Sequence, residues 1–224
     1  MQNSREIDRF SALERLPVCR AAFIGRLPEI DVAVDREAAL ARLKKSHDSL
    51  RAELGFAPAP FATAEQIHGN QIAAVKNLTE DHLFPGVDGL ITNQPNICLG
   101  IYVADCAAVY LVEKTGKAAA LVHSGKKGTE LGIVPAAIHA LQNDYGCDPA
   151  NIVVQISPCI RPPHYEVDFA AEILRQAQTA GVEIHDEGIC TASSPDHYYS
   201  YRREKGQTGR MLALLMLVPH GEKI

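Results

Sequence analysis

Residues 102–128 have the sequence YVADCAAVYLVEKTGKAAALVHSGKKG, in which apolar runs rich in β-branched residues flank a turn at Thr115-Gly116. Apolar runs of this length between turn residues predict buried β-strands. One run ends at Asp105 and Cys106, and a later run ends at His123. Because thiols and imidazoles both bind metal ions, this stretch predicts strands that carry candidate metal ligands at their ends.

Similar segments surround this stretch and set the expected fold class. Helical periodicity predicts helices at 35–54, with Asp35 as the N-cap, at 129–146 and at 167–181, and Ser194-Pro195 favours a short helix at 193–206. Strands that are apolar on both faces and mixed with helices predict an α/β protein, a three-layer α/β/α sandwich. No internal repeat is present, so residues 1–224 are expected to form a single domain. The strands are predicted at 19–25, 61–67, 71–76, 87–92, 97–104, 109–114, 117–123, 151–157 and 211–218.

Composition limits the class of partner. The chain has 224 residues, 46% of them hydrophobic, and a net charge of -5 with its basic residues spread along the sequence. This pattern disfavours nucleic acid and anionic membrane surfaces, so a small-molecule substrate is expected. The longest apolar run, at 211–218, is far shorter than the roughly 18 residues that a membrane helix requires. The N-terminus lacks a signal-peptide pattern, which favours a cytoplasmic location.

The cysteines are expected to be reduced thiols. They form no CxxC pair and are too sparse for a disulfide scaffold, so most should act as small buried apolar residues. Cys106 differs from the other cysteines, because Cys106, His68 and His123 each lie at the end of a predicted strand. Two imidazoles and a thiolate form a set that a catalytic zinc uses, with a fourth position left open. The alternative is a buried thiol and two histidines satisfied by backbone groups. The six cysteines are at positions 19, 98, 106, 147, 159 and 190.

A family resemblance favours the metal site. The segments EQIHGNQI, VDGLITNQPNICLGIYVADC, AALVHSGKKG, ISPCIRPPHYEV and CTASSPDHYYSYRRE with a later TGR resemble, in order, the motifs of the YfiH/YlmD family of laccase-domain proteins, also called multicopper polyphenol oxidoreductases. The resemblance covers about residues 61–211. It implies an α/β/α fold with a mixed sheet, and a zinc ion held by His68, Cys106 and His123. It also implies purine nucleoside phosphorylase activity, with adenosine deaminase and methylthioadenosine phosphorylase activity.

The chain departs from the family pattern near the expected substrate site. His123 is followed by SGKKG where the family usually has Ala-Gly-Trp-Arg-Gly, and the protein has no tryptophan. Lys127 takes the place of the arginine, so it keeps the charge but lacks the planar fork that binds phosphate in a bidentate manner. Ala108 and Ser157 replace a proline and a glycine, and the family's glycine-rich segment is missing after Arg26. These departures affect the expected substrate more than the expected metal.

Several residues are expected to act on a purine nucleoside and phosphate. Zinc would lower the pKa of a bound water for deamination, whereas phosphorolysis requires cations to hold phosphate. Asp105 is a candidate acid or base beside Cys106 and His123, or a turn carboxylate. Gln66 is a candidate to bind the purine edge, or a packing residue. The candidate cations, each alternatively a solvated surface charge, are Arg26, Lys127, Arg202 and Arg210.

Other functions remain open at the level of sequence. The family label suggests a copper-dependent polyphenol oxidase, although copper sites usually need more imidazoles, and often a methionine. A metal-free hydrolase would instead use Cys106 as a nucleophile activated by His123, and a cell-wall precursor editing factor would also be hydrolytic. The altered SGKKG loop is also compatible with a protein that binds a ligand without turnover.

Overall fold

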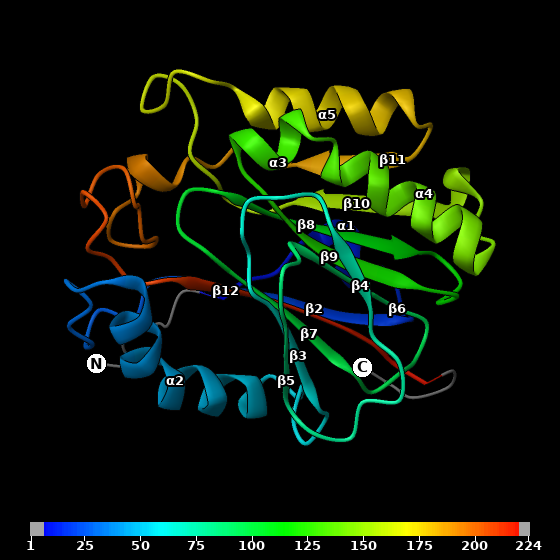
Figure 1. The fold of residues 1–224 in the computed structure, drawn as a ribbon, viewed down its shortest axis with the longest axis horizontal. Coiled ribbons are helices and arrows are strands. Elements are labelled where there is room, and N and C mark those ends of the chain that lie inside the picture. Colours follow the sequence, from blue (N-terminus) through cyan, green and yellow to red (C-terminus); the bar gives the residue numbers. More distant parts are fainter. Residues whose placement is uncertain (1–6, 220–224) are drawn as a thin grey trace.

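The structure, a computed structural model, describes residues 7–219 and contains two mixed β-sheets of six strands each. Figure 1 shows the two sheets stacked between helices. The first sheet has the strand order β1 (Ile7–Asp8), β2 (Cys19–Ile24), β12 (Met211–Leu217), β7 (Cys98–Val103), β3 (Phe61–Ala64) and β5 (His82–Phe84). The second has the order β11 (Glu183–Asp186), β10 (Ile152–Ile156), β8 (Ala107–Glu113), β9 (Ala119–Ser124), β6 (Gly89–Thr92) and β4 (Ile72–Ala74).

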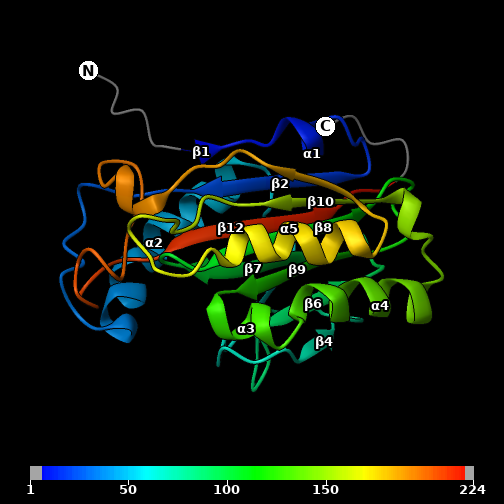
Figure 2. The same cartoon turned by 90° about the horizontal axis from the view of Figure 1, so that it is seen from above.

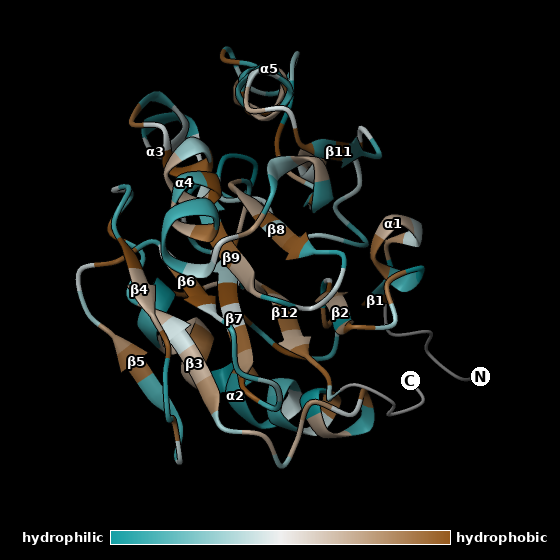
Figure 3. Ribbon diagram, turned by 90° about the vertical axis from the view of Figure 1, so that its right-hand side faces the viewer, coloured by the Kyte–Doolittle hydropathy of each residue, from teal (hydrophilic) through white to brown (hydrophobic). Residues whose placement is uncertain are grey.

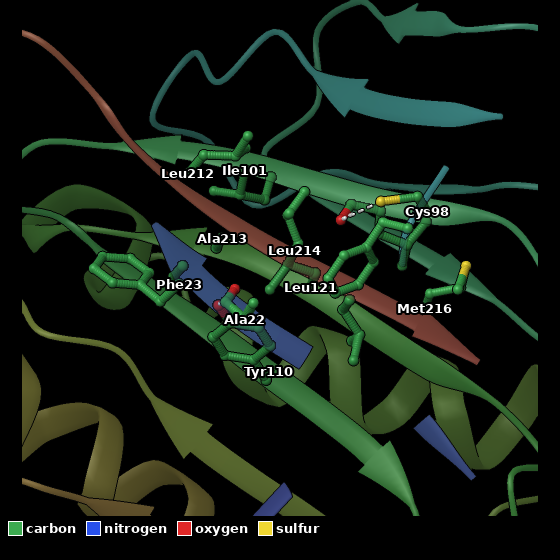
Figure 4. Packing of buried hydrophobic residues seen from close by; sticks show 14 of the residues in the cluster. Ala22, Phe23, Cys98, Ile101, Tyr110, Leu121, Leu212, Ala213, Leu214 and Met216 are labelled. Carbon is green, nitrogen blue, oxygen red and sulfur yellow. Dashed lines mark hydrogen bonds between the residues drawn. The ribbon is translucent and has the colours of Figure 1, made fainter. Parts of the chain in front are cut away.

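The main core lies between the two sheets. Every residue of β8, β9 and β12 is buried, because these central strands are covered on both faces. Figure 4 shows Tyr110 and Leu121 of the second sheet beside Phe23 and Leu214 of the first. The Tyr110 hydroxyl donates a hydrogen bond of 2.8 Å to the carbonyl oxygen of Ala22, so the one polar atom of this large buried side chain is satisfied across the core.

Helices cover the two outer faces. Helix α2 (Arg36–Glu53) lies on the side of the first sheet, and α3 (Lys126–Glu130), α4 (Ile133–Tyr145) and α5 (Phe169–Thr179) lie on the side of the second (Figures 1 and 2). The second group buries a separate apolar cluster against β8, β9 and β10. Hydropathy follows this arrangement: apolar residues concentrate in the central strands, and polar residues on the outer helices (Figure 3). The short α1 (Ser11–Glu14) contacts β2 and β10.

The expected mixed α/β class is confirmed, with the strands divided between two packed sheets rather than collected in one. A strand that is apolar on both faces has the same sequence pattern whether a helix or another sheet covers it. The fold therefore has four layers, in the order helix, sheet, sheet, helix. Within residues 7–219, no helix is long and apolar enough to cross a membrane. All six cysteines are free thiols.

The predicted helices have different outcomes. The helix expected at 35–54 is α2, and Asp35 caps it by accepting a hydrogen bond of 2.9 Å from the Ala38 N–H. The helix expected at 167–181 is α5. The one expected at 129–146 is interrupted before α4, because Gly132 adopts the left-handed conformation at φ 73°. Pro135 then falls in the first turn of α4, where it is tolerated.

The prediction of a short helix at 193–206 is wrong. This region contains a 3-10 turn, η2 (Thr191–Ser193), and hydrogen-bonded turns. Side-chain carboxylates take the backbone N–H groups that a helix would use: Asp105 accepts from Arg202, and Glu204 accepts from Ser200. The elements not predicted are β1, α1, β5, β11, η2, the 3-10 turn η1 (Pro149–Asn151) and most of α3, which lies in the glycine-bounded SGKKG segment. All of them are short, so they carry little periodicity.

Candidate active site

Three potential metal ligands converge at one end of the second sheet. Strands β8 and β9 are antiparallel, so Cys106, directly before β8, lies beside the end of β9, where His123 is located. His68 approaches from the turn that follows β3. The ligand atoms of the three side chains all lie within 4.8 Å of one another, and the rings of His68 and His123 meet edge to face at 4.9 Å. His123 is buried, Cys106 is half-buried and His68 is exposed, so the group opens to solvent on one side.

A buried carboxylate that was not predicted, Asp88, orients two of these ligands. It precedes β6 and has no solvent exposure. Its Oδ1 lies 2.8 Å from His123 Nδ1 and also accepts a hydrogen bond of 2.8 Å from the His68 N–H. Its Oδ2 accepts from the N–H groups of Gly69 at 2.6 Å and Ile67 at 3.2 Å. Because Nδ1 of His123 is directed at Asp88, Nε2 is left for a metal, as in carboxylate–histidine–metal arrangements.

The turn that carries His68 has an unusual backbone. Gln66 and His68 adopt left-handed conformations, at φ 66° and 61°, which are uncommon for residues other than glycine. Successive N–H groups thereby converge on the Asp88 carboxylate, a backbone concavity of the kind that binds anions. The Gln66 side chain holds the start of the turn through two hydrogen bonds to Tyr102, one to its carbonyl oxygen at 2.6 Å and one from its N–H at 3.0 Å. Gln66 lines the cavity described below, with its amide engaged by the backbone.

Gly125 packs closely against the thiol of Cys106. A β-carbon placed at Gly125 would lie 2.4 Å from Cys106 Sγ, well inside van der Waals contact. The backbone of Gly125 has φ −103°, which any residue adopts, so the requirement for glycine at this position is steric. The glycine of the SGKKG segment thus leaves room for the sulfur, beside the start of α3.

Electrostatics favour an ionised thiol. Burial alone would raise the pKa of Cys106, but the charge and hydrogen bond of His123, together with those of His68, outweigh it and lower this pKa to about 6. Burial alone would lower the pKa of His123, whereas the Cys106 thiolate and Asp88 raise it to about 9. Burial opposes ionisation of Asp88 too, but hydrogen bonds from His123, Gly69 and His68 lower its pKa. The group therefore favours a thiolate and a carboxylate on opposite sides of His123.

This donor set fits a divalent metal ion. Two imidazoles and one thiolate are ligands that zinc prefers, and three protein ligands leave a fourth tetrahedral position open. The exposed side of the group supplies access to that position. The Asp88 contact supplies the outer hydrogen bond that fixes an imidazole ligand. Residues far apart in the sequence therefore come together in the structure as a group that could bind a metal ion.

The ligand group lines a cavity of about 870 Å³. Five cationic side chains face it, against the two carboxylates of Asp105 and Glu166, although the whole protein carries a net charge of -5. An excess of positive charge in a cleft attracts anions. Aromatic rings form other parts of the wall and offer surfaces for a flat ligand. The cations are Arg36, Lys126, Arg202, Lys205 and Arg210, and the aromatic residues are Tyr102, Tyr165, Phe169 and Tyr201.

Asp105 lines the cavity, but its carboxylate is engaged by the protein. Oδ1 accepts a hydrogen bond of 2.7 Å from the Thr191 hydroxyl, and Oδ2 accepts one of 2.7 Å from the Arg202 N–H. Asp105 has φ 80°, and its own carbonyl oxygen accepts from the Ile160 N–H. This residue therefore connects the segment before β8 to the two loops that form the opposite wall.

The four predicted cations are placed differently. Arg202 and Arg210 line the cavity. Arg26 does not: it pairs with Glu204 at 2.8 Å, donates to the Tyr198 carbonyl oxygen and stacks on Tyr199. Lys127 is exposed on α3 and does not line the cavity, whereas its neighbour Lys126 does.

Comparisons with known proteins show the family of the chain. A family model described as multi-copper polyphenol oxidoreductase laccase matches residues 28–173 and 167–218. A purine nucleoside phosphorylase of Streptomyces coelicolor is 31% identical over 191 residues, which cover 73% of this chain and 78% of that protein. The purine nucleoside phosphorylase YlmD of Geobacillus stearothermophilus is 29% identical over 202 residues, covering 72% of this chain and 74% of YlmD.

A solved structure has the same fold. The crystal structure of YlmD from Geobacillus stearothermophilus superimposes with a TM-score of 0.82, covering 98% of each chain at 23% identity. At this identity the likeness shows the architecture of two packed sheets.

Proposed function

Since the chain belongs to the multi-copper polyphenol oxidoreductase laccase family, with relatives named purine nucleoside phosphorylases, we propose that it is a metal-dependent purine nucleoside phosphorylase. The observation that carries this proposal is the His68–Cys106–His123 group on the wall of a cavity rich in cations and aromatic rings. Phosphorolysis needs both the aromatic rings and the cations, because a flat base and an anion must be held side by side.

Zinc is the metal we propose, held by His68, Cys106 and His123. When bound, it supplies a Lewis acid with one open position for an oxygen ligand. Asp88 holds His123 in the orientation that presents Nε2, and it holds the backbone of the His68 turn. The ionised state of Cys106 makes the thiolate available as a ligand at neutral pH.

The cavity residues position the two substrates. Tyr165, Phe169 and Tyr201 offer surfaces for the purine, and the cations hold phosphate beside C1′ of the ribose. An oxygen of hydrogen phosphate forms a bond to C1′, the bond from C1′ to the purine nitrogen breaks, and the departing purine takes the proton that the phosphate gives up. Asp105 positions Arg202 by accepting its N–H. Adenosine deamination and phosphorolysis of methylthioadenosine are further proposed activities of the same cavity, and a cytoplasmic location stays a prediction.

The test is direct. Purified protein of measured metal content is incubated with adenosine, inosine or methylthioadenosine, with and without phosphate, and the products are resolved by chromatography. We expect release of free base that depends on phosphate and is lost in His68→Ala, while His139→Ala, which alters an exposed histidine on α4, retains it. The proposal fails if protein with about one zinc per chain leaves all three nucleosides unchanged.

A second candidate function rests on a specific observation, the Cys106–His123–Asp88 arrangement. A thiol whose pKa is lowered to about 6 beside an imidazole that a carboxylate orients resembles the nucleophile of a thiol hydrolase. Chelation separates the two functions: removing the metal abolishes phosphorolysis, whereas it releases the thiolate for hydrolysis. The oxidase that the family name suggests would instead require copper bound to the active protein and oxidation of a phenol.

A further inference from the structure

Arg210 is a buried cation on the wall of the cavity. Its exposed fraction is 8%, and it directly precedes β12. Nη1 donates to two carbonyl oxygens of the adjacent backbone, those of Thr208 at 2.8 Å and Gly209 at 2.9 Å. These bonds fix the guanidinium with part of it on the cavity wall. Within residues 7–219, no carboxylate lies within ion-pair distance of it. Arg210 Cζ lies 5.9 Å from the centre of the Tyr201 ring, and the Asp105 carboxylate interacts with it only from beyond ion-pair distance. Burying a cation with no ion-pair partner is costly, and an anionic ligand would offset that cost.

A second guanidinium, that of Arg36, faces the same cavity. Arg36 is the first residue of α2, and its Nη2 donates to the carbonyl oxygen of Glu65 at 3.2 Å. It too has no carboxylate partner in the described part of the chain. Burial and then the nearby charge of Arg36 lower the pKa of Arg210, and the opposing influence of Tyr201, Cys106 and Asp105 does not offset them. Two guanidinium groups from distant parts of the sequence therefore line one cavity, and neither forms an ion pair with a carboxylate among residues 7–219.

The remaining arginine of the cavity differs from this pair. Arg202 forms an ion pair with Glu166 and stacks on Tyr165, with Cζ 4.8 Å from the ring centre. Its charge is already balanced at the rim. Arg36 and Arg210 are thus the two arginines on the cavity wall whose charge is not balanced by a carboxylate among residues 7–219. Guanidinium groups bind phosphoryl oxygens through paired hydrogen bonds, which lysine cannot reproduce.

We propose that Arg36 and Arg210 form a binding site for a phosphoryl dianion on the wall of the cavity that holds Cys106. The site deepens the proposed function and rests on it for its role in turnover. The dianion has two possible sources with the same chemistry: inorganic phosphate as the second substrate, or a phosphoryl group carried by the nucleoside itself. Lys127, one of the four cations expected to hold phosphate, does not line the cavity and is not part of this site.

Binding is measured first, without nucleoside, so that the result does not depend on catalysis. Isothermal titration of the metal-loaded protein with inorganic phosphate compares wild type with Arg36→Gln, Arg210→Gln and Arg210→Lys. The control is Arg42→Gln, also on α2, because Arg42 pairs with Asp31 outside the cavity. We expect the Kd for phosphate to rise at least about tenfold in both glutamine variants, less in Arg210→Lys, and not in the control.

Steady-state kinetics then identify the source of the phosphoryl dianion. If the dianion is inorganic phosphate, Arg36→Gln raises the KM for phosphate. If it belongs to the substrate, adenosine 5′-monophosphate competes with phosphate for binding and is cleaved better than adenosine, and Arg36→Gln removes that preference. Either result supports the site. Arg36 is exposed, so its variant keeps the test valid if Arg210→Gln fails to fold.

The proposed phosphoryl site is overturned if a folded Arg36→Gln protein, with the metal content of wild type, binds phosphate with unchanged affinity. This holds even if the protein catalyses phosphorolysis. Conversely, loss of phosphate binding in the variants of a protein inactive on nucleosides supports the site and rejects the proposed function. The phosphoryl site and the proposed function can therefore be rejected independently of each other.

Discussion

Replacing Asp88 with asparagine tests whether a single buried carboxylate organises the metal ligands. Four hydrogen bonds converge on its two oxygens, from His123, His68, Gly69 and Ile67. An asparagine of the same shape has one accepting oxygen and one donating NH₂ group. If the oxygen stays toward His123, the N–H groups of Gly69 and Ile67 face another donor. If the amide is reversed, the donor faces His123 Nδ1, and Nε2 must carry the proton that prevents metal binding.

The first orientation loses two of the four hydrogen bonds, and the second loses the bond from the His68 N–H and reverses the one to His123. At about 1.5 to 3 kcal/mol for a bond to a charged group, partly recovered by relaxation, we expect the free energy of unfolding to fall by about 2 to 4 kcal/mol. We also expect zinc affinity to fall about 10- to 100-fold, as for other outer hydrogen bonds to metal-bound histidines. The magnitude follows from the complete burial of Asp88, which excludes water as a replacement partner.

The assay is competition for zinc against a chromophoric chelator at neutral pH, with urea denaturation of the metal-free protein. Asp144→Asn, an exposed change on α4, is the matched control and should leave both measurements unaltered. Zinc affinity of Asp88→Asn within about twofold of wild type would refute the reasoning, because it would mean that His123 does not depend on this contact.

Further predictions concern the thiol, a close packing contact and two buried polar side chains. Gly125→Ala should displace the Cys106 sulfur, since its β-carbon would lie 2.4 Å from Sγ, and should lower zinc content on metal analysis without unfolding the chain. After chelation, Cys106 should react with iodoacetamide half-maximally near pH 6, and zinc should protect it; a midpoint near 9 would contradict the thiolate. Burial lowers the pKa of His47 to about 4, and neither ring nitrogen has a hydrogen-bond partner within the described chain. The unfolded chain therefore binds the proton more readily, stability falls from about pH 6.5 toward 4 by about 3 kcal/mol, and His47→Leu should flatten that slope in urea titrations. Tyr110→Phe removes the buried hydrogen bond to the Ala22 carbonyl oxygen, so chemical denaturation should show a loss of about 1 kcal/mol.

The elements that depend on local sequence could be predicted. The cap of α2 could be predicted because the Asp35 carboxylate and the Ala38 N–H that it binds are only three residues apart. The strands β8 and β9 follow from apolar runs bounded by turns, and their antiparallel pairing follows from the short connection between them. The helix expected at 193–206 failed because its N–H groups bind Asp105 and Glu204, and Asp105 is distant in sequence.

By itself the sequence determined the mixed α/β class, the order of most strands and helices, and the three residues able to ligate a metal, because periodicity, caps and residue chemistry are local properties. Only the tertiary structure decided that the strands form two sheets, that Asp88 holds His123 and the His68 turn, and that Arg36 and Arg210 line one cavity. Those contacts join segments far apart in the chain, and their energies come from burial and from charges brought together by folding. No pattern within a single segment records them.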